Sequence, residues 1–196
     1  MREAEIERKT TETDVKVRLL LDGAGAVEVS TGIGFFDHML TQVGVHGLFD
    51  LRVKVKGDLE IDPHHSIEDS GLVLGEAFSQ ALGDRRGIVR MASVFISMDD
   101  ALAQVVLDFS GRPYVVVQAQ WVSAEVAGIA TSLIEHFFES FANSARCNLH
   151  ARVLYGRDNH HICEALFKAF GRALDAATQI DLRRSGEVAS SKGVLA

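Results

Sequence analysis

His64-His65-Ser66-Ile67-Glu68 is the stretch that organises the whole chain, because its pattern returns as His160-His161-Ile162-Cys163-Glu164. The two copies lie 96 residues apart (160 minus 64) in a chain of 196 residues. A pattern that returns after about half the chain length indicates an internal duplication. Matches in the surrounding sequence test this interpretation.

Three other pairs of segments match in the same order along the chain. They are residues 22–25 with 108–111, 37–40 with 135–138, and 76–82 with 168–174. Their separations are 86, 98 and 92 residues (108 minus 22, 136 minus 38, 168 minus 76). Because the order is kept and the separations stay near 96, chance is a poor explanation. The sequence predicts two similar halves, residues 1–86 and 87–196, that form one compact unit and meet at the polar turn of residues 83–87.

The hydrophobic pattern predicts the elements of each half. Alternating apolar residues favour strands, and apolar residues three or four apart favour helices. In the first half we expect strands at residues 13–21, 26–30 and 51–55, with helices at 34–45 and 66–82. Residues 22–25 would form a hairpin turn between the first two strands. In the second half we expect strands at 103–107, 114–119 and 149–154, helices at 132–144 and 161–178, and a loop from 183 to 196.

This pattern is typical of the α+β class. Each half would be a mostly antiparallel sheet with helices packed on one face.

Composition restricts the partners. The net charge of −7 argues against nucleic acid, because phosphate backbones attract basic surfaces. No run approaches the roughly 20 apolar residues that cross a membrane, and charged residues 1–8 do not resemble a secretory signal. Cys163 is expected to fill a helix face rather than bind metal. We therefore expect a cytoplasmic protein without nucleic-acid or membrane partners, in which a few Arg and Lys residues can still hold a small anionic substrate.

The repeated histidines predict metal binding. On a helix Glu68 lies one turn from His64 and His65, whereas adjacent imidazoles point about 100° apart and would serve different ions. His38 and His136 add one imidazole per half, which gives each of two ions three imidazoles and one carboxylate. The expected ligands are His38, His64, His65, Glu68, His136, His160, His161 and Glu164. Such ligands suit Mn, Fe, Zn or Ni.

The histidine pairs also have a plainer interpretation. A single His-His pair at a helix start is usually a capping or surface feature. Six of the eight histidines, however, fall at duplicated positions with a carboxylate one turn away, which favours metal. Of the other two, His46 is interpreted as a substrate contact facing the site and His150 as structural.

These motifs point to a family. The chain resembles imidazoleglycerol-phosphate dehydratases, the hydro-lyases of histidine biosynthesis, and the doubled motif is the most specific likeness. The matching segments are residues 8–13, 31–40, 46–47, 64–69, 98–99, 108–113, 135–138, 159–165, 167–170 and 190–195. They run from near the first residue to the last, so the resemblance covers the whole chain.

The resemblance implies a fold, a cofactor and an assembly. The fold would be ribosomal-protein-S5-domain-2-like, with two Mn²⁺ ions per active site. The homo-oligomer would have 24 subunits, with active sites where subunits meet. The eight ligands above would bind the metal. The implied substrate contacts are Glu12, His46, Arg90, Arg112, Lys168, Ser190 and Lys192. Asp99 matches an acidic position near the site, and its role is left open.

The expected reaction is dehydration of imidazole glycerol phosphate to imidazole acetol phosphate, at a dinuclear metal site that binds the imidazole ring. A carboxylate must move a carbon-bound proton, and Glu12 and Glu164 are candidates ahead of Glu68. Arg112 ranks first among the cations offered to the phosphate, and Lys192 is expected to close over it with the tail. The alternatives are a dinuclear hydrolase of phosphate esters and a non-enzymatic metal-binding shell, which would hold many ions per subunit.

Overall fold

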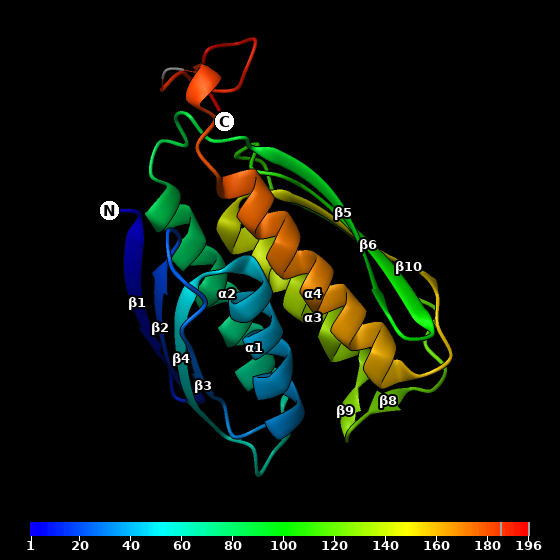
Figure 1. Ribbon diagram of the computed structural model, residues 1–196. Coiled ribbons are helices and arrows are strands. Elements are labelled where there is room, and N and C mark those ends of the chain that lie inside the picture. The colour runs from blue at the N-terminus through cyan, green and yellow to red at the C-terminus, as the bar shows by residue number, and fades with distance from the viewer. Residues whose placement is uncertain (185, 196) are drawn as a thin grey trace.

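The two halves of the chain contain the same elements in the same order. The computed structural model describes residues 1–184 and 186–195 (Figure 1). The first half consists of β1 (Glu3–Lys9), β2 (Thr13–Leu20), β3 (Val27–Ser30), α1 (Gly34–Gly47), β4 (Asp50–Gly57) and α2 (His64–Leu82). The second half consists of β5 (Met91–Met98), β6 (Ala101–Asp108), β7 (Tyr114–Gln118), α3 (Thr131–Ala145), β10 (Asn148–Tyr155) and α4 (Asn159–Thr178). The short strands β8 (Glu125–Val126) and β9 (Ile129–Ala130) precede α3, and the 3-10 helix η1 (Leu182–Arg184) opens the tail.

The expected division at residue 86 falls between α2 and β5. The predicted tail includes residues 185 and 196, which lie outside the described residues. No described helix has the length and apolar character needed to cross a membrane.

Each half forms a four-stranded sheet with the same strand order, β1-β2-β4-β3 and β5-β6-β10-β7. The first three strands of each sheet pair antiparallel, and the last strand pairs parallel. Along β2, Val15 and Val17 are fully buried, whereas Lys16 and Arg18 are exposed. Each sheet therefore has one face for the core, and the predicted α+β class with two similar halves is confirmed.

The predicted hairpin at residues 22–25 is wrong. β3 does not pair with β2 but lies parallel to β4, with Val29 opposite Val53. β4 occupies the place beside β2, where Val53 pairs with Val17. The connection must pass the end of β4 to reach its other side, and there Asp50 Oδ1 accepts hydrogen bonds from the backbone of Ala24 (2.8 Å) and Ala26 (3.0 Å).

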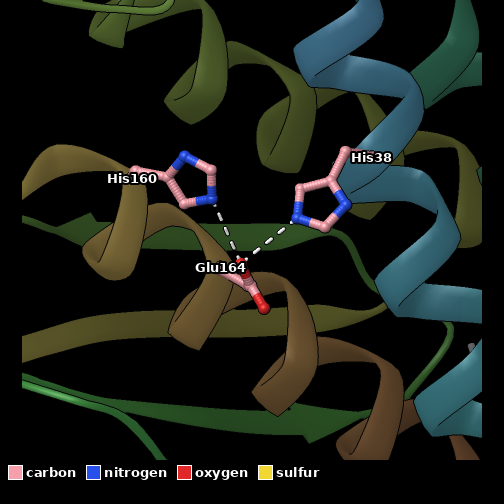
Figure 2. Close-up of side chains that lie close together, drawn as sticks. All are labelled: His38, His160 and Glu164. Carbon is pink, nitrogen blue, oxygen red and sulfur yellow. Dashed lines mark hydrogen bonds and ion pairs between the residues drawn. The ribbon is translucent and has the colours of Figure 1, made fainter.

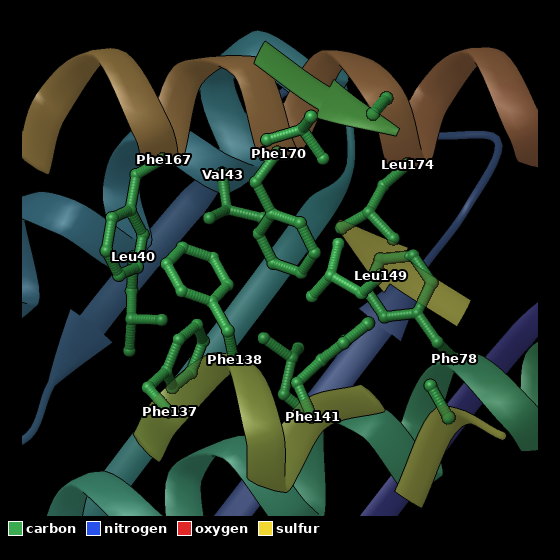
Figure 3. Packing of buried hydrophobic residues seen from close by; sticks show 14 of the residues in the cluster. Leu40, Val43, Phe78, Phe137, Phe138, Phe141, Leu149, Phe167, Phe170 and Leu174 are labelled. Atoms are coloured by element: carbon green, nitrogen blue, oxygen red, sulfur yellow. The ribbon is translucent and has the colours of Figure 1, made fainter. Parts of the chain in front are cut away.

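The four helices lie between the two sheets (Figure 1). They pack in pairs that join the halves, α2 against α3 and α1 against α4. Phenylalanines fill the space among them (Figure 3). The ring of Phe141 on α3 lies 4.8 Å from that of Phe170 on α4 and 5.5 Å from that of Phe78 on α2. Each fully buried Phe contributes about 1.5–3 kcal/mol, so one shared core holds the halves together.

Two glycines bring the paired helices into close contact. A Cβ atom on Gly75 of α2 would lie 2.5 Å from the Phe141 carbonyl oxygen of α3. A Cβ atom on Gly171 of α4 would lie 2.7 Å from the Val43 carbonyl oxygen of α1. Gly75 and Gly171 differ by 96 residues, the same separation as the two motifs. The predicted match of residues 76–82 with 168–174 is therefore displaced by one turn, since both helices run without a break from their histidines.

Candidate active site

The pairing of α1 with α4 creates the first histidine–glutamate cluster (Figure 2). His38 Nε2 and His160 Nε2 each lie 3.2 Å from Glu164 Oε2. Glu164 is one turn after His160 on α4, whereas His38 comes from the other half of the chain. The Glu164 side chain is only 9% exposed, so the two imidazoles meet over a buried carboxylate.

The start of α4 fixes where its histidines point. Asp158 is the N-cap, and its side chain accepts hydrogen bonds from the backbone N–H groups of His160 (2.7 Å) and His161 (3.3 Å). At the start of α2 the side chain of Asp62 accepts a hydrogen bond from His64 N at 2.7 Å. Both His-His pairs therefore occupy the first turn of a helix, where the side chains project beyond the packed helix body.

A lysine holds Glu164 in its ionised form. Burial alone would raise the pKa of Glu164, but hydrogen bonds from Lys168 and His38 outweigh it and lower the pKa to about 2. Lys168 Nζ lies 2.6 Å from Glu164 Oε1 and 3.3 Å from Met98 Sδ. A carboxylate with so low a pKa is a good ligand and a weak base.

The second cluster is the counterpart of the first across the repeat. His64 Nε2 lies 3.5 Å and His136 Nε2 lies 3.6 Å from Glu68 Oε2. Here α2 supplies the His–Glu pair and α3 supplies the other imidazole. Glu68 is 36% exposed, and Leu72 stands at the position that matches Lys168. This cluster is thus more open and has no lysine at that position.

The remaining two predicted ligands, His65 and His161, lie outside both clusters. His65 Nδ1 lies 3.1 Å from Asp58 Oδ2, and this hydrogen bond raises the pKa of His65. His161 Nδ1 lies 2.6 Å from Asp100 Oδ1, which raises the pKa of His161 in the same way. A carboxylate on Nδ1 orients the ring and leaves Nε2 for a ligand, as is usual for metal-binding histidines.

Each of these outer imidazoles has a second acid near its Nε2 atom. Glu12, in the turn between β1 and β2, lies 3.9 Å from His65 Nε2. Asp99, in the turn between β5 and β6, lies 3.7 Å from His161 Nε2. Asp99 is therefore the counterpart of Glu12 across the repeat.

The donor atoms fit a divalent metal. Within each cluster the three ligand atoms lie within 4.8 Å of one another. His136 Nε2 is buried, and among the described residues no hydrogen-bond partner reaches it, so a metal would satisfy an otherwise costly atom. Imidazole nitrogen with carboxylate oxygen suits Mn, Fe and Zn. Within one chain each cluster offers two imidazoles and one carboxylate, one imidazole fewer than the sequence predicts.

His46 lies close to the first cluster. Gln42 bridges it to His38, with Gln42 Oε1 3.2 Å from His46 Nε2 and Gln42 Nε2 3.3 Å from His38 Nδ1. Burial and, next, the charge of Lys168 lower the pKa of His46. His46 and Lys168 thus flank the first cluster.

Four of the other predicted substrate contacts, Arg90, Arg112, Ser190 and Lys192, lie at the opposite end of the helices from the clusters, whereas Glu12 lies beside His65. Arg90 N donates to the Ala177 carbonyl at the carboxyl end of α4, and Gly111 N, beside Arg112, donates to the Arg146 carbonyl after α3. The 20 residues of α4 place its two ends about 30 Å apart. The tail with Ser190 and Lys192 leaves from that far end (Figure 1). One chain therefore does not bring these residues to its own clusters.

Arg90 is already engaged at that end. Its Nε and Nη2 atoms donate to Asp108 at 2.6 and 2.9 Å, and its Nη1 atom donates to the Ala189 carbonyl of the tail. A guanidinium has five N–H donors, so two remain for another ligand. In the tail, Lys192 N donates to Ser190 Oγ at 3.2 Å.

Sequence reasoning missed Gln42, Asp58 and Asp100. Asp58 lies seven residues before His65, and Asp100 lies 61 residues before His161. No shared spacing links these acids to their histidines, because a loop after β4 supplies one and a strand turn supplies the other. Only the neighbouring pair Asp99-Asp100 hinted at an acidic turn near the site.

Fold and site together define a class of protein, a duplicated α+β chain with two equivalent His–Glu clusters at the amino ends of paired helices. The family model for imidazoleglycerol-phosphate dehydratase matches residues 31–174. Because this match covers more than half of the chain, the chain belongs to the imidazoleglycerol-phosphate dehydratase family. Members of the family are dehydratases, which places the chain among the lyases.

Full-length relatives agree with this assignment. The imidazoleglycerol-phosphate dehydratase of Chloroflexus aurantiacus is 57% identical over 195 residues, covering 100% of this chain and 95% of the relative. That of a Roseiflexus species is 56% identical, covering 99% and 98%. Among solved structures, the enzyme of Pyrococcus furiosus matches with a TM-score of 0.85 at 37% identity, covering 97% of this chain and 100% of that one. The Staphylococcus aureus enzyme matches with a TM-score of 0.82 at 34% identity, covering 91% and 99%.

Proposed function

We propose that this chain dehydrates imidazole glycerol phosphate to imidazole acetol phosphate in histidine biosynthesis. One observation carries the proposal. A member of this dehydratase family that matches 95% of a relative's length assembles two His–Glu clusters from opposite halves of the chain, each able to hold a divalent ion. The proposal includes Mn²⁺ as the ion, two per active site, and the cytoplasm as the compartment of a biosynthetic enzyme.

The reaction breaks a carbon–oxygen bond and a carbon–hydrogen bond. The hydroxyl beside the ring leaves with its bonding electrons, and a proton leaves the neighbouring carbon, so that an enol forms and becomes the ketone. That proton is weakly acidic, because no carbonyl stands next to it. Bound metal would supply Lewis acidity to the ring nitrogens or to the departing oxygen.

The carboxylates have two roles, metal binding and proton transfer. Glu164, with a pKa of about 2, and Glu68 would serve as ligands, since each already touches two imidazoles. Glu12 is the better candidate for moving the proton, because it lies in an accessible turn 3.9 Å from His65 Nε2. Asp99, in the matching turn 3.7 Å from His161 Nε2, is the equivalent acid of the second half.

The distribution of residues favours sites shared between subunits. His65 and His161 are partly exposed imidazoles that belong to neither cluster of their own chain. Each would complete a cluster of a neighbouring copy and give the predicted three imidazoles and one carboxylate. Arg90, Arg112, Ser190 and Lys192, about one helix length from the clusters, would likewise hold the phosphate of a substrate bound at a neighbour's metal site. His46 and Lys168 would contact the substrate from the cluster side. We propose the 24-subunit assembly on this basis and on the family resemblance.

An assay with the substrate tests the proposal. Purified protein, stripped of metal and then restored with Mn²⁺, is given imidazole glycerol phosphate, and the ketone product is measured. We expect product only after metal is restored. Release of inorganic phosphate without ketone would indicate an ester hydrolase instead, and no reaction with many ions bound per chain would indicate a metal-binding shell.

A further inference from the structure

Arg85 is a buried arginine in the connection between the two halves. It is only 7% exposed, and the described residues include no carboxylate in an ion pair with it. Its backbone has φ 61°, a left-handed conformation that suits glycine and costs an arginine free energy. The contacts of the side chain must offset both costs.

The guanidinium binds three carbonyl groups from two segments. Arg85 Nη1 donates to the carbonyls of Phe109 and Arg146, both at 3.1 Å, and Nη2 donates to the Ala145 carbonyl at 3.0 Å. Ala145 and Arg146 end α3, and Phe109 begins the loop after β6. One cation therefore ties the carboxyl end of a helix to the base of that loop.

The same loop carries Arg112, and two more of its carbonyls accept side-chain hydrogen bonds from residues at the end of α3 and the start of β10. The Gly111 carbonyl accepts from Arg146 Nε at 3.1 Å, and the Arg112 carbonyl accepts from Asn148 Nδ2 at 2.7 Å. Gly111 N in turn donates to the Arg146 carbonyl that Arg85 holds. The loop that carries Arg112 is thus linked to Arg85 through the shared Arg146 carbonyl.

The charge of Arg85 also matters to an anion. The carboxyl end of a helix carries partial negative charge, which would oppose a phosphate nearby. Arg85 places a positive charge on the last carbonyls of α3, directly beneath the loop, while the neighbouring acid Asp108 is taken up by Arg90.

We propose that Arg85 is a positioning residue for the phosphate-binding loop. It fixes residues 109–112 against the end of α3 and offsets the helix charge, so that Arg112 meets the phosphate of the substrate. The inference rests on the proposed function, in which Arg112 binds that phosphate.

The test compares Arg85→Met with Arg86→Met in the metal-loaded, assembled protein. Arg86 is the matched control, because it is the next residue and its exposed guanidinium forms an ion pair with Asp84. Two constants are measured, the KM for imidazole glycerol phosphate and the inhibition constant of inorganic phosphate. We expect Arg85→Met to raise both by at least about tenfold with kcat little changed, the scale of losing hydrogen bonds to a charged group, and Arg86→Met to raise neither. Arg85→Lys keeps the positive charge but loses the two-pronged guanidinium that binds several carbonyls at once. Its two constants are expected to lie between those of Arg85→Met and wild type.

A purely structural role would give a different result. If Arg85→Met lowers the melting temperature but leaves both constants within about twofold of wild type, the inference is wrong. Should Arg85→Met fail to fold, Arg85→Lys decides, because unchanged constants in that variant would exclude positioning by the guanidinium.

Arg112→Met separates this inference from the proposed function. If it raises both constants and Arg85→Met does not, only the inference fails. If neither variant changes the two constants, the loop does not bind phosphate, and both the inference and the proposed role of Arg112 are wrong. Turnover by the wild type still tests the dehydratase assignment.

Discussion

Glu164 combines the contacts expected of a metal ligand rather than of a free base. Lys168 and His38 hold its pKa near 2, and His160 approaches the same oxygen as His38. Above that pKa the Glu164 carboxylate stays ionised.

Glu164→Gln tests this assignment, because it keeps the size of the side chain and removes the charge. We expect the metal content to fall from about two ions per chain to about one, and turnover to fall at least a hundredfold, on the order of the losses seen when metal sites are disturbed. Metal is measured by elemental analysis and turnover with saturating Mn²⁺. Glu76→Gln, at an exposed position of α2, is the control. Full metal content with wild-type turnover would remove Glu164 from both roles.

The reactivity of the Cys147 thiol tests whether the core around it stays packed. Burial raises the pKa of its thiol to about 12. The reactive thiolate forms only as the pH rises through the folded pKa, so at pH 8 the native thiol should resist alkylation. We expect iodoacetamide to modify Cys147 in urea but not in the native protein, as read by peptide mass spectrometry. Rapid native labelling at pH 8 would show that this region opens.

Single residues also show where the sequence was informative. Duplication marked the six residues of the two clusters twice in the sequence, so they could be predicted to lie together. Asp58 and Asp100 could not, since each reaches its histidine only through the folded path of a loop. The sequence also did not show that each cluster has only two imidazoles within one chain. Sequence spacing does not say toward which chain a histidine at a helix end points.

At the scale of elements, helix pairing decides whether the clusters form. Gly171 lets α4 approach α1 closely enough for His38 to meet Glu164, and Gly75 does the same for α2 and α3. The helices were predictable from their periodicity, and their bounds agree within a few residues. Their pairing across the halves was not, because it depends on shape rather than on hydrophobic pattern.

Gly171→Ala should therefore weaken both stability and metal binding. The added methyl group meets the Val43 carbonyl oxygen and must push α1 away, which we expect to lower the free energy of unfolding by about 1–3 kcal/mol. The measurement is urea denaturation, with a metal titration alongside. Gly34→Ala is the control, because nothing lies within 4 Å of a Cβ atom there. Equal stability of both variants would contradict the close-contact account.

The strands were harder to predict than the helices. β1 and β5, which occupy the same edge position in the two sheets, were both missed. An edge strand buries one face only, and of the seven residues of β1 only Ala4 and Ile6 are apolar. β3 was found but was given the wrong partner. A connection of six residues, 21–26, allows a crossing over β4 as readily as a hairpin, and only the long-range pairing of Val53 with both Val17 and Val29 resolves it.

At the scale of the whole molecule, the length of α4 separates the clusters from the end that carries Arg90, Arg112 and Lys192. The duplication predicts two equal metal sites, but it does not predict this separation. It follows from four helices that run parallel within each pair, with the tail leaving from the carboxyl end of α4 (Figure 1). The histidines of the clusters lie near the amino ends of these helices.

Removal of residues 190–196 tests the role of the tail. We expect the KM for imidazole glycerol phosphate to rise at least about tenfold, because Ser190 and Lys192 are lost from the phosphate, while the metal content stays unchanged. Steady-state kinetics with elemental analysis measures both. An unchanged KM would show that the tail does not cover the phosphate.

The most direct test of the account is a titration of metal-stripped protein with Mn²⁺, followed by turnover of imidazole glycerol phosphate. Two His–Glu clusters per chain predict no ketone product without metal and full activity at about two ions per chain. Full turnover by stripped protein, or activity that saturates at one ion per chain, would contradict it.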